Sequence, residues 1–407
     1  MKQDALFKSE EAVLKKAVSL IEAAGQSDQI DKTEYISLLK SYKKLFKQLK
    51  LLVKMGDIQQ NKLNKLNEKL DRQNLFIKKT FGRYLSDDIV ECILESPQGS
   101  SLGGEKRVVT IVLTDIRGFT AITERESAEN IVGILNIYLE TMTEIIFKHG
   151  GTIDEFIGDS ILVIFGAPVK SEDHADTAVT CAIEMQQAMA EVNQKNREMG
   201  YPEIEMGIGI NTGELIVGNI GSEKRAKYAV VGSHVNLTSR IESYTVGDQI
   251  LISESTMNRC KKELIIDSDF EIKPKGMTKP IRVFEVGGIS GDSSISTTKR
   301  SYSMITLERP VPIAMTIIQE KHSIGHSFNG EFIKLGPRGA ELTTGKKIDP
   351  FSNLKISVES GILTGEEQHL YGKIMNRQAQ GIQSGYRYNF YFTSVPEKFG
   401  EKIKAYE

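Results

Sequence analysis

Two aspartates of the chain, Asp115 and Asp159, each stand at the end of a strongly apolar segment. Asp115 closes the run 108-VVTIVLTD-115, and Asp159 lies in the short turn of the segment 152-TIDEFIGDSILVIF-165. A single carboxylate in such a place is ordinarily a solvated loop acid. Two of them held on rigid strands can instead bind Mg²⁺ that also bridges substrate phosphates, because Mg²⁺ prefers carboxylate oxygens.

A second pair of polar side chains lies in the segment 228-YAVVGSHVNLTSRIES-243. Asn236 and Arg240 are four positions apart, so on a helix they share one face. Together they offer an amide and a planar, permanently charged guanidinium to a phosphorylated ligand. Taken alone, an Asn and an Arg at this spacing are more often ordinary exposed side chains without a ligand.

The elements that must position these residues are predicted by the hydrophobic pattern over 105–287. We expect a strand, a helix that begins after Ser127, the hairpin 152–165, a helix over 173–197, a strand over 203–210, a glycine-broken loop over 211–221 and a helix from about Ser233. This order predicts an α/β or α+β sandwich in which helices cover a mostly antiparallel sheet. The hairpin argues against a doubly wound dinucleotide-binding fold.

Three acids surround the turn of that hairpin, and we expect them to have different roles. Glu155 and Asp159 are an even number of positions apart, so both are expected to face one pocket. Asp154 is expected to point the other way as ordinary solvated charge.

The N-terminal region carries apolar residues at an alternating spacing of three and four over several heptads. This seam predicts a parallel, dimeric coiled coil rather than a long helix packed on its own domain. Ser86 is expected to cap a short helix that ends before Pro97. The apolar positions of the seam are Tyr35, Leu38, Tyr42, Leu45, Leu49, Leu52, Leu63, Leu66, Leu70 and Ile77, and its three positions without an apolar residue are Gly56, Gln59 and Gln73.

Length and composition fit a chain of several domains. We expect a helical region over 1–97, the α and β segment over 105–287, a Gly/Ser-rich linker over 288–303 and a last domain over 304–407. The net charge of −2 over 407 residues argues against a nucleic-acid binder. The three scattered cysteines and the absence of a long apolar run predict a cytoplasmic protein without a transmembrane segment.

The segment over about 105–287 resembles the class III nucleotide cyclases, the catalytic domain of adenylate and guanylate cyclases. The resemblance implies a ferredoxin-like α+β fold. Several motifs occur in the family's order, which is far more specific than any single glycine pattern. The matching motifs are 113-LTDIRGFT-120, 157-IGDSILVIFGAP-168, 206-MGIGINTGELIVGNIG-221, 232-GSHVNLTSRIE-242 and 275-KGMTKPIRVFEV-286.

The resemblance implies roles for the two polar pairs. Asp115 and Asp159, with Ile116, would hold two Mg²⁺ ions, which Mn²⁺ can replace. Asn236 would orient the ribose, and Arg240 would stabilise charge on the α-phosphate during attack by the 3′-hydroxyl. The backbone amides of Ile116, Arg117, Gly118, Phe119 and Thr120 would cradle phosphate oxygens. One subunit would supply the metal pair and the other the Asn/Arg pair, so a homodimer is implied.

The residues expected to contact the base leave two nucleotides as alternatives. The family as a whole favours ATP, but Glu155 stands where guanylate cyclases carry the same residue, and a carboxylate suits guanine's N1–H and N2 donors. Its partner position is Ala229, which cannot bond a base. Met277 stands where a lysine often contacts phosphates, so Lys275 or Lys279 would substitute. GTP is therefore the alternative substrate, and a nucleotide-binding signalling scaffold without turnover is a second alternative.

The C-terminal region is predicted to be a small β-barrel, because short strands recur between Gly, Pro and Asn turns over 304–395. The pattern 331-EFIKLGPRGAEL-342 faintly resembles a motif of PilZ domains, which bind cyclic di-GMP. Lys334 and Gly336 replace the Asp/Asn and Ser of that motif. We therefore expect a PilZ-like regulatory or protein-binding module, with cyclic di-GMP as the less favoured ligand.

Overall fold

A computed structural model describes residues 8–24, 32–81, 102–274, 277, 279–297, 304–319, 322–358, 369–375, 380–382, 385–395 and 399. The chain divides into two compact units, Met1–Tyr84 and Leu85–Glu407. The expected helix between Ser86 and Pro97 lies outside the described residues, as do Cys92 and Lys275. Each unit is described by itself.

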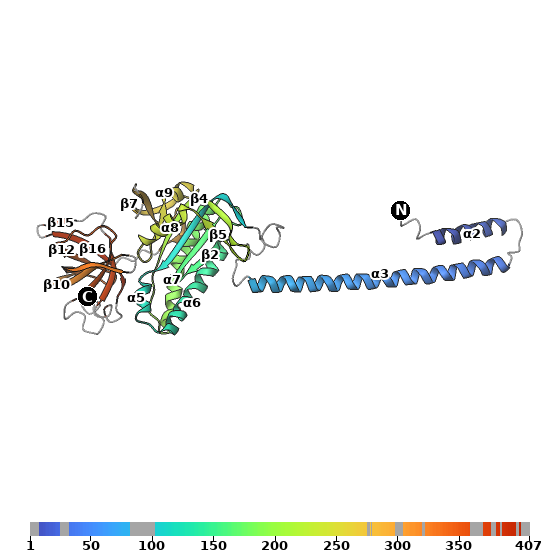
Figure 1. Cartoon of the computed structure of the whole chain (residues 1–407), viewed down its shortest axis with the longest axis horizontal. Coiled ribbons are helices and arrows are strands. Elements are labelled where there is room, and N and C mark those ends of the chain that lie inside the picture. Colours follow the sequence, from blue (N-terminus) through green and yellow to red (C-terminus); the bar gives the residue numbers. More distant parts are fainter. Residues whose placement is uncertain are drawn as a thin grey trace. The chain divides into compact units, whose positions relative to one another are not determined.

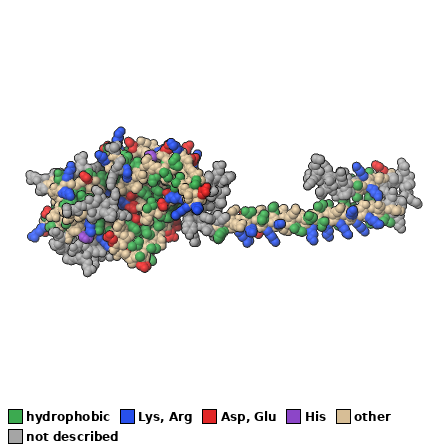
Figure 2. All heavy atoms as spheres, in the orientation of Figure 1, with side chains coloured by type: hydrophobic (Ala, Val, Ile, Leu, Met, Phe, Trp, Pro, Cys, Tyr) green, Lys and Arg blue, Asp and Glu red, His purple; other side chains and the backbone are tan. Residues whose placement is uncertain are grey.

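The first unit consists of helices α2 (Lys8–Ala24) and α3 (Lys32–Phe81), both visible in Figure 1. Lys16 Nζ donates to Ser37 Oγ at 2.8 Å and joins the two helices. Large apolar side chains of the heptad seam are exposed along α3, and Figure 2 shows them beside a row of basic side chains. An exposed seam of this kind fits a helix that pairs with another chain, and the coiled coil stays a prediction.

The second unit begins with a mostly antiparallel sheet, whose main path is β2-β3-β1-β4-β6-β8-β7. Beside this path, β5 pairs with β4 and β9 pairs with β8. Among the described strands of this sheet, β4 and β6 are parallel and the other pairs are antiparallel. The strands are β1 (Gly103–Ile116), β2 (Thr152–Ile157), β3 (Ser160–Phe165), β4 (Met206–Ser222), β5 (Arg225–Val231), β6 (Ile250–Ser253), β7 (Leu264–Ile272), β8 (Ile281–Ile289) and β9 (Asp292–Ser296).

Helices cover this sheet and complete its core. The main core joins the inner faces of α6 and α7 to the central strands, with Ile134, Tyr138 and Met142 fully buried. By length and a mean hydropathy of 1.2, α6 also qualifies as a membrane span, but here its apolar face lies against the sheet. The helices are α5 (Phe119–Thr123), α6 (Ala128–Lys148), α7 (His174–Glu198), α8 (Ser233–Ser243) and α9 (Glu254–Arg259).

Several local predictions are confirmed by this part of the molecule. Ser127 caps α6, because its side chain accepts a hydrogen bond from the Asn130 amide. The turn between β2 and β3 has two residues, and Gly158 adopts a left-handed φ of 65° there. The antiparallel character of the sheet is as expected.

Two predictions about segment boundaries are wrong. The expected glycine-broken loop over 211–221 is the continuation of β4, which pairs with β1 and β5 along its whole length. Glycines there are compatible with a strand because neighbouring backbones approach closely. The expected linker over 288–303 contains the end of β8 and all of β9. In the described part of this segment, over 288–297, the chain forms a β-hairpin of β8 and β9 rather than a free connection.

The C-terminal part of the second unit is a barrel, as predicted. Six strands close it, because β12 pairs with both β11 and β16. Lys334, Gly336 and Arg338 line a cavity of about 660 Å³ on this barrel. Nothing in the fold identifies a ligand for it. The strands are β10 (Ile305–Gln319), β11 (His322–Leu335), β12 (Gly339–Thr344), β13 (Asn353–Val358), β14 (His369–Ile374), β15 (Gln380–Ile382) and β16 (Gly385–Ser394).

Candidate active site

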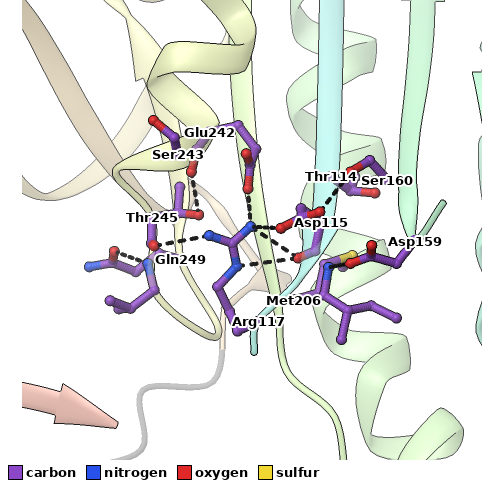
Figure 3. Close-up of polar contacts among 12 residues, drawn as sticks. Thr114, Asp115, Arg117, Asp159, Ser160, Met206, Glu242, Ser243, Thr245 and Gln249 are labelled. Atoms are coloured by element: carbon purple, nitrogen blue, oxygen red, sulfur yellow. Dashed lines mark hydrogen bonds and ion pairs between the residues drawn. The ribbon is translucent and has the colours of Figure 1, made fainter. Parts of the chain in front are cut away.

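Asp115 lies near the end of β1, and both oxygens of its carboxylate are held by neighbours (Figure 3). Ser160 Oγ donates to Asp115 Oδ1 at 2.6 Å, and Arg117 Nη2 donates to Asp115 Oδ2 at 2.6 Å. A carboxylate offers about four lone-pair directions, so acceptor capacity is left for a cation. The side chain is therefore fixed in orientation and still able to bind.

Asp159 lies in the turn that precedes β3, the strand that pairs with β1. Its Oδ2 accepts a hydrogen bond from the Ile116 amide at 3.1 Å. Burial, together with the neighbouring Asp115 carboxylate, raises the pKa of Asp159 to about 7. The predicted pair of aspartates is thus brought together, and the two negative charges repel each other.

A divalent cation fits this pair because it would relieve the repulsion. Within the described residues no cluster of three or more His, Cys, Asp or Glu side chains exists that could hold a metal by itself. Asp115, Asp159 and the Ile116 carbonyl would therefore supply the protein ligands, and water and phosphate oxygens the others. Partial coordination by protein is typical of Mg²⁺ sites that take up phosphates.

The raised pKa of Asp159 makes stability depend on both pH and metal. Folded Asp159 binds a proton up to about pH 7, whereas an unfolded aspartate loses it near its ordinary pKa of 3.8. Without metal, stability therefore falls as pH rises through this window. A divalent cation binds the deprotonated pair, so its stabilising effect should be larger above about pH 7 than below. Melting curves with Mn²⁺ and with a chelator at several pH values measure the difference, and a pH-independent effect of metal would contradict it.

Arg117 is the centre of a buried ion-pair cluster behind Asp115, as Figure 3 shows. Its guanidinium pairs with Glu242 as well as with Asp115, and it donates to the Thr245 carbonyl at 3.4 Å. The side chain is 8% exposed. Arg117 thereby connects the carboxylate at the end of β1 to the C-terminal end of α8.

Two glycines of β4 make room for this connection. A Cβ on Gly207 would collide with Thr245 Oγ1 and lie 3.2 Å from Arg117 Nε. A Cβ on Gly209 would lie 2.5 Å from the Glu242 backbone nitrogen. The intervening Ile208 points into the hydrophobic core, so the two faces of the strand have opposite requirements. Glycine at these positions lets α8 approach β4 closely.

Asn236 and Arg240 both lie on α8, as predicted, four residues apart. Asn236 is exposed and Arg240 half-buried. In the described part of the chain, no hydrogen bond or ion pair links either side chain to Asp115 or Asp159. One copy of the chain thus presents the two polar pairs separately.

The acids of the hairpin are arranged differently from the prediction for Asp154. A β-bulge between Ile153 and Glu155 places an extra residue in β2, so neighbouring side chains fall on the same side. Lys227 Nζ lies 3.0 Å from Glu155 Oε2 and 3.4 Å from Asp154 Oδ2. The Asp154 side chain is only 4% exposed, and burial raises its pKa. Asp154 is therefore not a solvated bystander.

Ala229 lies on β5 two residues beyond Lys227, so the two side chains share a face of that strand. Ala229 is buried. Lys227 therefore lies beside both positions expected to contact the base, because it pairs with Glu155 and shares a face of β5 with Ala229. This lysine was not predicted from the sequence.

Two backbone amides of the loop after Asp115 already donate hydrogen bonds within the protein. The amide of Ile116 donates to Asp159, and the amide of Arg117 donates to the Glu205 carbonyl at 2.7 Å, so both are already used. Gly118 has a left-handed φ of 67° and stands at the N-terminus of α5, which begins with Phe119 and Thr120. Amides at a helix start lack intrahelical acceptors. Gly118, Phe119 and Thr120 are therefore the available amides of this loop.

Three further residues belong to the site but were not predicted. Ser160 follows Asp159 directly and begins β3, the strand that pairs with β1. Its position next to Asp159 in the sequence could have indicated that it lies near Asp115. Glu242 lies within the motif 232-GSHVNLTSRIE-242, but only the fold brings it to Arg117. Lys227 gave no signal, since its two partners lie more than seventy residues away.

Comparison with known proteins identifies the domain that carries this site. The family described as adenylate and guanylate cyclase catalytic domain matches residues 104–284. This segment of the chain belongs to that family. The family predicted from the motifs is thus confirmed, whereas neither the coiled coil nor the PilZ-like character of the barrel is.

Two curated relatives of the chain are named adenylate cyclases. The chain is 32% identical over 212 residues to adenylate cyclase 1 of Rhizobium meliloti, covering 52% of this chain and 32% of the relative. It is 34% identical over 236 residues to an adenylate cyclase of Anabaena cylindrica, covering 55% and 44%. The chain thus spans less than half the length of these curated relatives.

The chain is similar to solved structures of both a guanylyl cyclase and an adenylyl cyclase. The guanylyl cyclase Cya2 is 49% identical, with 48% of this chain and 100% of that chain covered and a TM-score of 0.47. The adenylyl cyclase CyaB from P. aeruginosa is 38% identical, with 46% and 96% covered and a TM-score of 0.44. The names of these relatives leave the base open.

Proposed function

We propose that this protein converts a purine nucleoside triphosphate to its 3′,5′-cyclic monophosphate and pyrophosphate. The ribose 3′-oxygen forms a bond to the α-phosphorus, the bond to pyrophosphate breaks, and the hydroxyl proton passes to solvent. The observation that carries the proposal is the juxtaposition of Asp115 and Asp159 on neighbouring strands, with the pKa of Asp159 raised to about 7. Such a pair suits a metal that binds phosphates.

The chain's own residues have separate tasks in this reaction. Asp115, Asp159 and the Ile116 carbonyl would hold two Mg²⁺ or Mn²⁺ ions, which lower the pKa of the attacking hydroxyl and balance charge on the triphosphate. Ser160 and Arg117 fix the orientation of Asp115. The free amides at the start of α5 bind phosphate oxygens.

Asn236 and Arg240 act from a second copy of the chain. Asn236 orients the ribose, and the Arg240 guanidinium stabilises negative charge that grows on the α-phosphate. The lack of contact between this pair and the aspartates within one copy supports a shared site in a homodimer. The exposed seam of α3 offers a second surface for the same dimer.

The base site favours GTP. Glu155 offers two acceptor oxygens, which match the adjacent N1–H and N2 donors of guanine. Lys227, paired with Glu155 at 3.0 Å, offers a donor to guanine O6. ATP remains the second candidate, because the curated relatives named above are adenylate cyclases and Lys227 can also donate to adenine N1.

A direct assay tests the enzymatic function against a nucleotide-binding scaffold without turnover. The purified full chain is incubated with Mg²⁺ or Mn²⁺ and with GTP or ATP, and the products are separated by chromatography. We expect cyclic nucleotide and an equal amount of pyrophosphate. Binding of both nucleotides without any cyclic product would favour the scaffold.

The role of Glu155 is tested by Glu155→Lys. An ammonium group cannot accept a hydrogen bond from guanine N1–H, so the ratio of kcat/KM for GTP to that for ATP should fall at least ~10-fold. Steady-state kinetics with both nucleotides measure the ratio. Glu144→Lys, an exposed site on α6, is the matched control and should leave it unchanged. An active Glu155→Lys enzyme with the original preference would mean that the base is read elsewhere.

A further inference from the structure

The barrel is joined to the cyclase domain by two cations that are largely removed from solvent. Lys373 of β14 is 2% exposed, and its Nζ donates to the Ser243 carbonyl at 2.6 Å and the Thr245 carbonyl at 2.8 Å. The Ser243 carbonyl ends α8 and the Thr245 carbonyl follows it, at the end of the helix where the helix dipole attracts positive charge. Lys373 is thus seated on the helix that carries Asn236 and Arg240.

Arg338 makes the second junction. This residue precedes β12, and its guanidinium lies 2.5 Å from Glu205 Oε1 and 2.6 Å from Asp248 Oδ2. Tyr391 of the barrel donates to the other oxygen of Glu205 at 3.2 Å. The Glu205 carbonyl accepts the Arg117 amide. Arg338 therefore holds the segment against which the loop after Asp115 is bonded.

The end of β16 lies directly on that loop. A Cβ on Gly118 would collide with the Thr393 carbonyl oxygen and lie 2.9 Å from Ser394 Cβ. Arg125, just beyond α5, donates to Ser394 Oγ and to the His369 carbonyl at 3.3 Å each. The barrel thus covers the Cα side of Gly118 and brings the Thr393 carbonyl oxygen against the loop whose amides are proposed to bind phosphates.

Burial of such side chains is costly unless they are hydrogen-bonded, as Lys373 is, or ion-paired, as Arg338 is, so the contact is specific rather than incidental. It also touches both halves of the proposed site at once: the loop after Asp115 and the C-terminal end of α8. A loop fixed in this way cannot shift to receive a triphosphate. An added carbonyl oxygen beside an anion-binding loop opposes phosphate as well.

We propose that the C-terminal barrel is an intramolecular brake, which holds the phosphate loop and α8 in an unproductive arrangement while it is docked through Lys373 and Arg338. This inference rests on the proposed cyclase function. Turnover then requires the barrel to leave, and a partner that competes for its docked face would act as an activator.

Two full-length variants test the brake from independent sides. Lys373→Met keeps the length and apolar stem of the side chain, and Arg338→Gln leaves only partly exposed acids unpaired. Each should raise kcat at least ~10-fold, because loss of a buried charge contact shifts the docked population by more than that factor. Amide hydrogen exchange at 116–120 and 243–248 should become faster in both. Lys347→Met, on the exposed surface of the barrel, should change neither.

The outcomes separate the brake from the function on which it rests. Faster exchange with kcat unchanged or lower would overturn the brake while leaving the cyclase intact. Unchanged exchange in both variants would show that these residues do not hold the barrel, which also overturns it. No cyclic product from any of the proteins, with either nucleotide, would overturn the cyclase function and the brake together.

Discussion

We expect Asp159→Asn to lower kcat at least ~1000-fold, because the change to an amide removes one of the two carboxylate ligands for the metal. The same substitution should make the metal-free protein more stable above about pH 7, since it removes a partly buried charge that repels Asp115. Activity and stability thus change in opposite directions. Steady-state kinetics and thermal unfolding in the presence of a chelator measure both.

Asp173→Asn is the matched control for this variant. Asp173 is an exposed acid at the start of α7, where it pairs with Lys261. It has no role in the proposed site. Activity should be kept and stability hardly changed. If Asp159→Asn retained most of its activity, or if it were destabilised without metal, the assignment of Asp159 as a metal ligand would be wrong.

We expect that mixing two inactive variants, Asp159→Asn and Arg240→Ala, restores activity. Asp159→Asn removes the metal pair from its own subunit, and Arg240→Ala removes the guanidinium from its own. A mixed dimer has one site with both groups intact, so an equal mixture that exchanges subunits should reach roughly a quarter of wild-type activity. Each variant alone should remain at least ~100-fold below wild type.

The control mixture combines Asp159→Asn with Asp115→Asn. Both substitutions affect the aspartate pair, so every site in a mixed dimer has a defective pair and no activity should return. Restored activity in this mixture would contradict a site in which each aspartate pair comes from one subunit. A lack of recovery in the first mixture, despite subunit exchange shown by mass spectrometry, would contradict the shared site itself.

The sequence was most informative where local rules decide the structure. The cap at Ser127 and the turn at Gly158 depend only on neighbouring residues, and both are confirmed. The loop expected over 211–221 was wrong because a run of glycines is ambiguous. In β4, Gly218 and Gly221 lie against neighbouring backbones and Gly213 lies against the His234 ring, and these tertiary contacts cannot be predicted from the local sequence.

The candidate site was predictable in its residue types and not in its charge pairs. Asp115 and Asp159 could be selected because each ends an apolar strand. The partners Glu242 and Lys227 are brought in by tertiary structure, far along the chain. Asp154 was misassigned because a bulge changes the side that a residue faces without any required residue type.

The alternation along β4 has a consequence for how this domain can vary. Usually, the positions of a strand that accept the widest range of residues are those opposite the main core. In β4 those positions are Gly207 and Gly209, where even a methyl group would press on Thr245 or Glu242. The core-facing residues, in contrast, can exchange for other apolar groups of similar volume. The strand is therefore most restricted in sequence where it has no side chain at all.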